Sequence, residues 1–262
     1  MKTRLDKLLV ERGLTPTRER AQALVLAGRV LVNEQKIDKP GASFSNDAAI
    51  RLLGAGPRYV SRGGLKLEAA LAHWHIGLTG RFCLDVGAST GGFTDCMLQH
   101  GAPRVLAIDT GYGQIAQSLR DDPRVSLMER TNARYLNPGS LPGGISFLAV
   151  DVSFISATLV LPPVLAALRP VPEAHVPNVG HASDAVGHTP LEAVILVKPQ
   201  FEAGREHVGK GGIVRDPAAH QLAIERIRSS VSQLGVATAD VIDSPITGAE
   251  GNREFLLHAR WP

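Results

Sequence analysis

The segment Phe82–Gly101, FCLDVGASTGGFTDCMLQHG, constrains the fold of this chain more than any other. An apolar run leads to Asp85, a glycine-rich turn follows, and a helical pattern begins after the turn. Gly87, Gly91 and Gly92 permit positive φ angles and a close approach of the backbone to a ligand. A strand, a glycine-rich turn and a helix in this order predict an α/β domain that holds a ligand at the turn.

The spacing of the turn indicates which ligand it holds. The pattern is GxxxGG, whereas dinucleotide-binding folds typically have GxGxxG. Asp85 stands just before the first glycine, where a carboxylate can meet an ammonium group. Asp109 ends the next apolar run, about twenty residues on, in place to accept hydrogen bonds from ribose hydroxyls. A nicotinamide-binding fold would offer a similar turn, but these features favour S-adenosylmethionine.

From Leu65 onward, apolar runs alternate with helical patterns, as in a doubly wound α/β domain. Strands are expected near Phe82–Val86, Val105–Asp109, Val125–Met128, Phe147–Val152, Val194–Lys198, Ala239–Ile242 and Glu254–Ala259. The last two runs suit an antiparallel edge strand at the C-terminus. The expected fold class is therefore α/β, a Rossmann-like class I domain over 65–262, with a seven-stranded sheet and an antiparallel last strand.

Residues 1–60 predict a small, separate α+β unit, and the glycine-rich stretch at about 52–64 predicts a linker. A helix is expected over Arg4–Arg12, a second helix after a cap at Thr15 or Thr17, and a hairpin over 30–37.

This N-terminal part is strongly basic. Residues 1–66 hold 13 Lys and Arg against 6 Asp and Glu, whereas the remainder holds 15 against 19. Such asymmetry suggests that the basic part binds a polyanion while the other part carries out chemistry, although a basic face also arises by chance. The candidate RNA-binding residues are Arg4, Lys7, Arg18, Arg20, Arg29, Lys36 and Arg62.

Four charged residues stand at the edges of expected elements: Lys66, Asp151, Lys198 and Glu254. The carboxyl ends of parallel strands line the ligand crevice, and a lysine there is unusual. A ribose hydroxyl is a poor nucleophile at neutral pH, so a base must remove its proton. Lysine can act as that base where desolvation or nearby cations lower its pKa from about 10.4. Each residue alone could be a surface charge, but the four together favour catalysis.

Several segments carry a resemblance to known families. RLDKLLVERGL and TRERAQALVLAGRVLVN resemble the S4 domain, a small RNA-binding module. The Lys–Asp–Lys–Glu order resembles the ribose 2′-O-methyltransferases of the FtsJ/RrmJ type. With YVSRGGLKL, DVGASTGGFTD, DVSFIS, VKPQFE and GNREF, the whole chain resembles the TlyA family of rRNA methyltransferases, whose members are also called haemolysins.

The resemblance implies methyl transfer from S-adenosylmethionine to a ribose 2′-hydroxyl of ribosomal RNA, at a cytidine. It makes Lys198 the general base or its closest equivalent, and it implies that Lys66 and Asp151 position the hydroxyl and the methyl group. Glu254 would hold the lysines. The implied cofactor-binding residues are Asp85, Gly87, Ala88, Ser89, Gly91, Gly92, Phe93, Asp109, Asn132 and Asp151.

Other features define what the chain is not expected to be. Neither its cysteines nor the histidines of the segment 169–190, an insertion relative to the family, have metal-site spacing. No signal or membrane-spanning segment is recognised, so we expect a cytoplasmic protein whose partners are ribosomal RNA and ribosomal subunits, with no membrane and no obligate protein partner. The segment 201–216, with Arg205, Lys210 and Arg215, is expected either to close over RNA or to be a solvated surface loop. A membrane-lysing protein and an RNA-binding protein without catalysis remain the alternatives.

Overall fold

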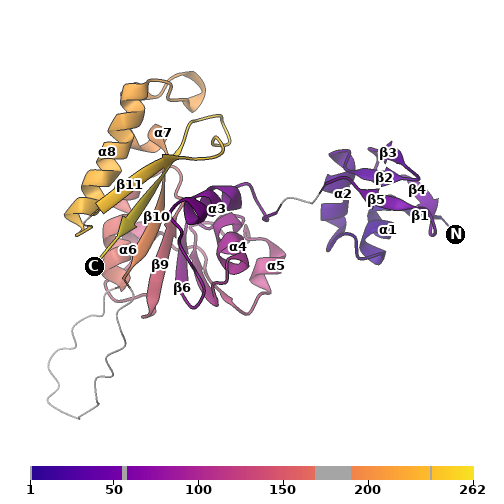
Figure 1. The fold of residues 1–262 in the computed structure, drawn as a ribbon, viewed down its shortest axis with the longest axis horizontal. Helices are drawn as coiled ribbons and strands as arrows, with labels where there is room; N and C mark the ends of the chain where they lie inside the picture. The colour runs from indigo at the N-terminus through magenta and orange to yellow at the C-terminus, as the bar shows by residue number, and fades with distance from the viewer. Residues whose placement is uncertain (1, 55–57, 169–189, 237) are drawn as a thin grey trace, which may run out of the picture. The chain divides into compact units, whose positions relative to one another are not determined.

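A computed structural model describes residues 2–54, 58–168, 190–236 and 238–262. The chain divides into two compact units, an N-terminal unit of residues 1–58 and a C-terminal unit of residues 59–262 (Figure 1). Within the stretch expected to be a linker, strand β5 ends at Leu52 and helix α3 begins at Gly63. Most of the expected insertion, residues 169–189, lies outside the described residues.

The N-terminal unit packs two short helices against small antiparallel sheets. Its elements are β1 (Lys2–Arg4), α1 (Leu5–Glu11), α2 (Arg18–Leu26), β2 (Val30–Val32), β3 (Gln35–Ile37), β4 (Ser43–Ser45) and β5 (Ile50–Leu52). Strands β3, β2 and β5 form one sheet in that order, and β1 pairs with β4. Thr17, rather than Thr15, caps α2, because its hydroxyl accepts a hydrogen bond from the backbone N–H of Arg20 at 3.2 Å.

The C-terminal unit is built on one mixed sheet of seven strands in the order β11-β12-β10-β9-β6-β7-β8. The strands are β6 (Phe82–Val86), β7 (Arg104–Ile108), β8 (Val125–Met128), β9 (Ile145–Val150), β10 (Glu192–Val197), β11 (Thr238–Asp243) and β12 (Phe255–Arg260). Strand β12 runs antiparallel to both of its neighbours, β10 and β11. The expected α/β class and the antiparallel last strand are thus confirmed.

The expectation that the C-terminal strand lies at the edge of the sheet is wrong, because β11 is the edge strand. Burial explains the difference. Phe255, Leu256 and Leu257 of β12 are all buried, so this strand needs a neighbour on each side. Strand β11 exposes Asp240 and Asp243, and charged side chains are typical of edge strands, where they discourage pairing with another chain.

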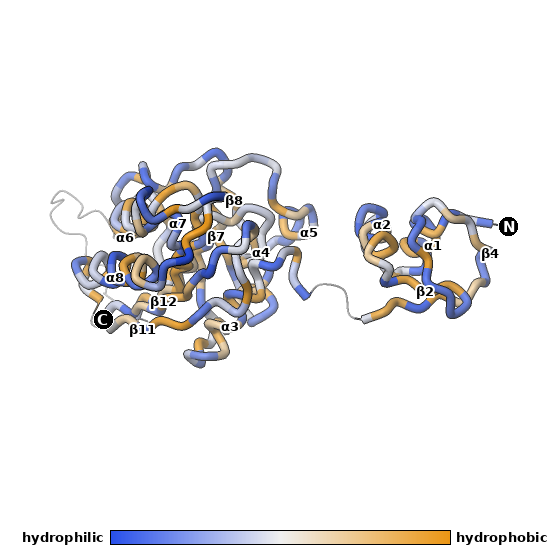
Figure 2. The backbone as a smooth tube through the Cα atoms, turned by 90° about the horizontal axis from the view of Figure 1, so that it is seen from above, coloured by the Kyte–Doolittle hydropathy of each residue, from blue (hydrophilic) through white to orange (hydrophobic). Residues whose placement is uncertain are grey.

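Helices cover both faces of this sheet (Figure 1). They are α3 (Gly63–His73), α4 (Gly92–Gln99), α5 (Gln117–Arg120), α6 (Leu161–Leu168), α7 (Pro199–Glu202) and α8 (Pro217–Gln233), with short 3₁₀ helices at Ala133–Tyr135, Ala157–Leu159, Arg205–His207 and Lys210–Gly212. Residues of α3, α4 and α5 share one apolar cluster with one face of the strands, while α6 and α8 share a second cluster with the other face. Hydrophobic backbone segments, orange in Figure 2, lie in these layers.

Alternation along β6 shows how the two clusters arise. Cys83 belongs to the cluster of α3 and α4, whereas Leu84 and Val86 belong to the cluster of α6 and α8. Successive side chains of a strand point to opposite faces, so a continuous apolar run serves both layers. Both cysteines of the chain are buried and free. Among the residues that the structure describes, no helix has the length and apolar character needed to span a membrane.

Candidate active site

A cavity of about 570 Å³ lies at the carboxyl ends of the parallel strands. It is lined by all four residues of the expected catalytic set, Lys66, Asp151, Lys198 and Glu254. Lys66 lies in the first turn of α3, and each of the other three stands one position outside a strand. The sequence placed Asp151, Lys198 and Glu254 inside their strands. Because these residues lie just outside the hydrogen-bonded strands, their side chains can turn into the ligand crevice.

The four side chains form two ion pairs. Nζ of Lys66 lies 2.6 Å from Oε2 of Glu254, and Nζ of Lys198 lies 2.6 Å from Oδ1 of Asp151. Lys198 also donates a hydrogen bond to Oγ of Ser153 at 2.7 Å. The side chains of both lysines are 10% exposed, and that of Glu254 is 3% exposed. Each buried ammonium therefore has a carboxylate of its own, as burial of charge requires.

The glycine-rich turn leaves β6 and enters α4 above this cavity. Gly87 has φ +89°, and a Cβ there would collide with the backbone carbonyl of Asp151. Gly91 is the N-cap of α4 with φ +93°. The turn residues that line the cavity are Gly87, Ala88, Ser89, Thr90, Gly92 and Phe93. The backbone of the turn is therefore drawn close to the loop after β9, where no side chain would fit.

Asp85 lies under the turn and is fully buried. Its Oδ2 accepts a hydrogen bond from Oγ1 of Thr94 at 2.6 Å, while Oδ1 has no hydrogen-bond partner among the described residues. Burial raises the pKa of Asp85 to about 7, the hydrogen bond from Thr94 opposes that rise, and the charge of Asp151 adds to it. Asp85 does not itself line the cavity.

Asp109 and Asn132 line a second cavity of about 320 Å³, which residues of the turn also line. The carboxylate of Asp109 accepts backbone hydrogen bonds from Ser89 at 2.7 Å and Gly111 at 2.6 Å. The Oδ1 atom of Asn132 accepts one from the backbone of Arg134 at 3.0 Å. Both cavities share Gly87, Ser89, Asp151, Ser153 and Phe154 as lining residues. An elongated ligand can therefore pass under the turn from one cavity to the other.

Sequence reasoning missed Phe154, which lines both cavities. The residue is 92% exposed, its φ is +64°, and its ring centroid lies 5.5 Å from that of Phe201. Glu202 anchors the loop, since its carboxylate accepts hydrogen bonds from Oγ of Ser156 at 2.5 Å and from the backbone of Ala157 at 2.8 Å. The signal in the sequence was an aromatic residue in a polar loop directly after a strand.

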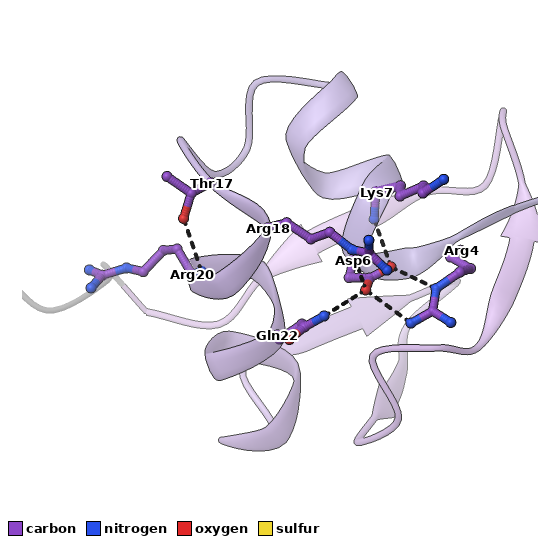
Figure 3. A network of polar contacts seen from close by, with 7 residues as sticks. All are labelled: Arg4, Asp6, Lys7, Thr17, Arg18, Arg20 and Gln22. Atoms are coloured by element: carbon purple, nitrogen blue, oxygen red, sulfur yellow. Dashed lines mark hydrogen bonds and ion pairs between the residues drawn. The ribbon is translucent and has the colours of Figure 1, made fainter. Parts of the chain in front are cut away.

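The candidate RNA-binding residues fall in both units. Arg4, Lys7, Arg18, Arg29 and Lys36 are exposed in the N-terminal unit, and Arg20 is partly exposed there. Arg62 belongs to the C-terminal unit, where it is exposed and lines the larger cavity. Arg4 and Arg18 both contact the buried carboxylate of Asp6 (Figure 3).

The segment after Lys198 is tied to the loop before β12. Asn252 is 1% exposed; its Oδ1 accepts a hydrogen bond from the backbone of Val214 at 2.9 Å, and its Nδ2 donates to the carbonyl of Gly212 at 2.8 Å. Arg205, Lys210 and Arg215 of this segment are exposed. Gly212 and Val208 line the larger cavity, so the segment forms part of its wall.

A seven-stranded sheet with one antiparallel strand and a glycine-rich turn at its carboxyl edge defines a class I methyltransferase fold. Comparison with protein families agrees. Residues 59–261 match the FtsJ-like methyltransferase family and residues 3–43 match the S4 domain. The chain belongs to the FtsJ-like methyltransferase family and carries an S4 domain.

Relatives of similar length support this assignment. A Bacillus subtilis protein named "Putative rRNA methyltransferase YqxC" is 48% identical over 100% of this chain and 86% of its own length. The 16S/23S rRNA (cytidine-2′-O)-methyltransferase TlyA of Mycobacterium tuberculosis is 41% identical over 99% of this chain and 90% of its own. A solved structure, "Putative hemolysin from Streptococcus thermophilus", is 42% identical with a TM-score of 0.69, covering 99% of this chain and 88% of that one.

The methyl donor of this enzyme class is S-adenosylmethionine, and the residues present fit it. Oδ1 of Asp85 is a buried acceptor without a partner among the described residues, which suits the ammonium group of the methionine moiety. The turn excludes a side chain at Gly87, as a closely bound ligand requires. The expected cofactor and enzyme class are thus confirmed.

Proposed function

We propose that this protein methylates the ribose 2′-hydroxyl of a cytidine in ribosomal RNA. The observation that carries the proposal is the pair of buried lysine–carboxylate contacts facing one cavity, Lys66 with Glu254 and Lys198 with Asp151, each at 2.6 Å. The rRNA substrate and the cytidine come from the names of the relatives. A cavity lined by two lysines and two carboxylates suits activation of a hydroxyl group.

Lys198 is the group that takes the proton from the ribose hydroxyl. For this step its amine must be unprotonated, so that it can accept the hydroxyl proton as the ribose oxygen bonds to the methyl carbon. S-adenosylmethionine, when bound, would supply the methyl group through cleavage of its methyl–sulfur bond, with S-adenosylhomocysteine as the leaving group. Asp151 then stabilises the resulting ammonium across 2.6 Å, and Ser153 accepts one of its N–H groups at 2.7 Å. These partners also fix the direction of the lysine side chain, so its nitrogen is oriented before the substrate arrives.

Lys66 and Glu254 form the second ion pair of the catalytic set. Glu254 neutralises Lys66, whose side chain is 10% exposed, and leaves its remaining N–H groups to donate to the ribose oxygen. An ammonium at this place favours the developing negative charge on that oxygen. The pair thus orients the nucleophile, while Lys198 removes the proton.

The two units divide the work in this proposal. The S4 domain holds the rRNA through exposed arginines and lysines that contact phosphate oxygens. In the C-terminal unit, Arg62 lines the larger cavity and contacts a phosphate there. Neither a membrane-lysing protein nor a purely RNA-binding protein requires a cavity with paired lysines and carboxylates, so Lys66, Asp151, Lys198 and Glu254 favour catalysis over both alternatives.

Transfer of labelled methyl groups tests the proposal. Small and large ribosomal subunits that lack the modification are incubated with labelled S-adenosylmethionine and the wild-type protein, Lys198→Ala or Lys198→Arg. The wild type should label rRNA, and both variants should lose at least about 10²-fold in rate, because arginine keeps the charge but does not accept a proton. Lys198→Arg is the matched control for the ion pair. Methylation by either variant at the wild-type rate would refute the role of Lys198.

Label in neither subunit, with cofactor binding intact, would refute ribosomal RNA as the substrate. Digestion of the labelled rRNA to nucleosides identifies which nucleoside is methylated. It also shows whether the methyl group is on the base or on the ribose. A methyl group on a base rather than a ribose would contradict the proposed hydroxyl chemistry.

A further inference from the structure

A buried carboxylate in the N-terminal unit gathers two arginines that are candidates for RNA binding. Asp6 is 0% exposed near the start of α1. Its Oδ1 accepts hydrogen bonds from Nε of Arg4 at 3.1 Å and from the backbone of Lys7 at 3.0 Å. Its Oδ2 accepts from Nη2 of Arg4 at 3.1 Å, Nε of Arg18 at 2.9 Å and Nε2 of Gln22 at 2.9 Å (Figure 3).

The arginines themselves are only half enclosed. The side chain of Arg4 is 46% exposed and that of Arg18 is 45% exposed. Arg4 ends β1 and Arg18 begins α2, so the carboxylate joins two elements distant in the sequence. Asp6 engages Nε and Nη2 of Arg4 but only Nε of Arg18, which leaves Nη1 of Arg4 and both terminal nitrogens of Arg18 as the donors that a ligand can reach.

The charge of this group suits an anion. Two guanidinium groups and one carboxylate leave a net positive charge. The hydrogen bond from Arg4 holds the pKa of Asp6 well below its usual range, with help from Gln22 and Arg18 and against the opposing effect of burial. Asp6 therefore stays ionised at neutral pH, and both arginines stay anchored to it.

Anchoring changes what binding costs. The conformational entropy of a free arginine side chain on the surface corresponds to a free energy of about 2 kcal/mol, and part of it is lost when the side chain binds a phosphate. Arg4 and Arg18 are already restrained by Asp6, so less freedom remains to be lost on binding. The same restraint fixes the separation of the two guanidinium groups and thereby the spacing of the phosphate oxygens that they can contact.

We propose that Asp6 is a positioning residue that presents Arg4 and Arg18 as a fixed pair to the phosphate backbone of the RNA substrate. This inference rests on the proposed function. It makes a prediction opposite to that of net charge alone: removing an acidic residue should favour binding of a polyanion, whereas removing Asp6 should weaken it.

The test compares Asp6→Asn with Asp38→Asn in the full chain. Asp38 is an exposed acidic residue of the same unit, so both variants lose one negative charge. Dissociation constants for unmodified ribosomal subunits are measured between ~50 and ~200 mM salt. Asp6→Asn should weaken binding on the order of tenfold. The slope of log K against log salt should become shallower by about 0.7 to 0.9 for each phosphate that the variant no longer neutralises. Asp38→Asn should bind as tightly as the wild type or slightly more tightly.

A second set of variants separates positioning from damage to the fold. Arg4→Gln/Arg18→Gln removes the presented pair, and Asp6→Asn is then added to it. If Asp6 acts through the two arginines, the added substitution costs no further affinity. A larger loss for Asp6→Asn than for Arg4→Gln/Arg18→Gln would overturn the inference, because the effect would then extend beyond the pair.

Kinetics distinguish this inference from the proposed function. Since the candidate catalytic residues lie in the other unit, Asp6→Asn should raise KM for RNA and leave kcat unchanged. A wild-type protein that binds and methylates rRNA while Asp6→Asn binds like Asp38→Asn would overturn the inference alone. A wild-type protein that neither binds nor methylates rRNA would overturn the proposed function and this inference with it.

Discussion

Nζ of Lys66 and Oε2 of Glu254 lie 2.6 Å apart, although one belongs to the helix before the first strand of the sheet and the other precedes its last strand. The contact exists because β12 returns between β10 and β11 and brings its first residues to the same edge as α3. Insertion of the antiparallel strand therefore completes the candidate catalytic set.

Glu254→Gln should destabilise the protein strongly. The substitution leaves the buried ammonium of Lys66 without a compensating charge, and removal of one partner of a buried pair costs about 3 to 5 kcal/mol. Urea denaturation measures the loss. The double variant Lys66→Met/Glu254→Leu, which removes both charges, should recover most of it. A single variant as stable as the wild type would show that water reaches Lys66.

Asp85 should make stability depend on pH. Its pKa in the folded protein is about 7, above the usual carboxyl value, so the folded state binds a proton more tightly than the unfolded chain. Stability from this group is present at low pH and is lost as pH rises toward 7. Asp85→Asn should remove this dependence and stabilise the cofactor-free protein above pH 7, as thermal unfolding at several pH values would measure.

The cofactor should reverse this preference at Asp85. The ammonium group of the methionine moiety favours the ionised carboxylate, so S-adenosylmethionine should bind more tightly as pH rises through about 7. Calorimetric titration of the wild type and of Asp85→Asn over this range provides the check. An equal pH dependence of affinity in both proteins would show that Asp85 does not meet the ammonium group.

The glycine-rich turn shows how far the sequence can predict the site. Its strand, turn and helix follow from local pattern, and the structure places them at Phe82–Val86 and Gly92–Gln99. The four charged residues of the catalytic set were recognisable because each stands at the edge of an expected strand or helix. Their pairing was not, because which lysine meets which carboxylate depends on the order of strands in the sheet. The position of β12 was missed for the same reason, and Phe154 because its exposure is a property of the folded loop.

Gly87→Ala should disrupt the turn, whereas Gly77→Ala should not. Gly87 has φ +89° and faces the carbonyl of Asp151, so a methyl group adds a collision to the strain of a left-handed backbone, together at least about 2 kcal/mol. Gly77 has open space around its Cβ position and an ordinary φ. Denaturation and cofactor titration of both variants give the comparison. Equal cofactor affinity in the two would mean that the ligand does not pass close to Gly87.

Phe154→Ala should impair recognition of RNA without loss of stability. Phe154 is 92% exposed, lines both cavities and lies against Phe201, so its ring offers a flat surface on which the base of the target nucleotide can stack. Stacking of a base on an aromatic side chain contributes about 1 to 3 kcal/mol. KM for rRNA should rise accordingly, while the free energy of unfolding should change by no more than about 0.5 kcal/mol.

Phe154→Tyr is the matched control, because it keeps the ring and should keep a KM close to that of the wild type. Phe154 combines an exposed ring with a φ of +64°, a conformation that a bulky residue adopts only where the surrounding structure imposes it, so we expect a binding role. If Phe154→Ala and Phe154→Tyr share the KM of the wild type, the target base does not stack there. A fall in kcat with unchanged KM would instead place the ring in contact with the nucleotide only during methyl transfer.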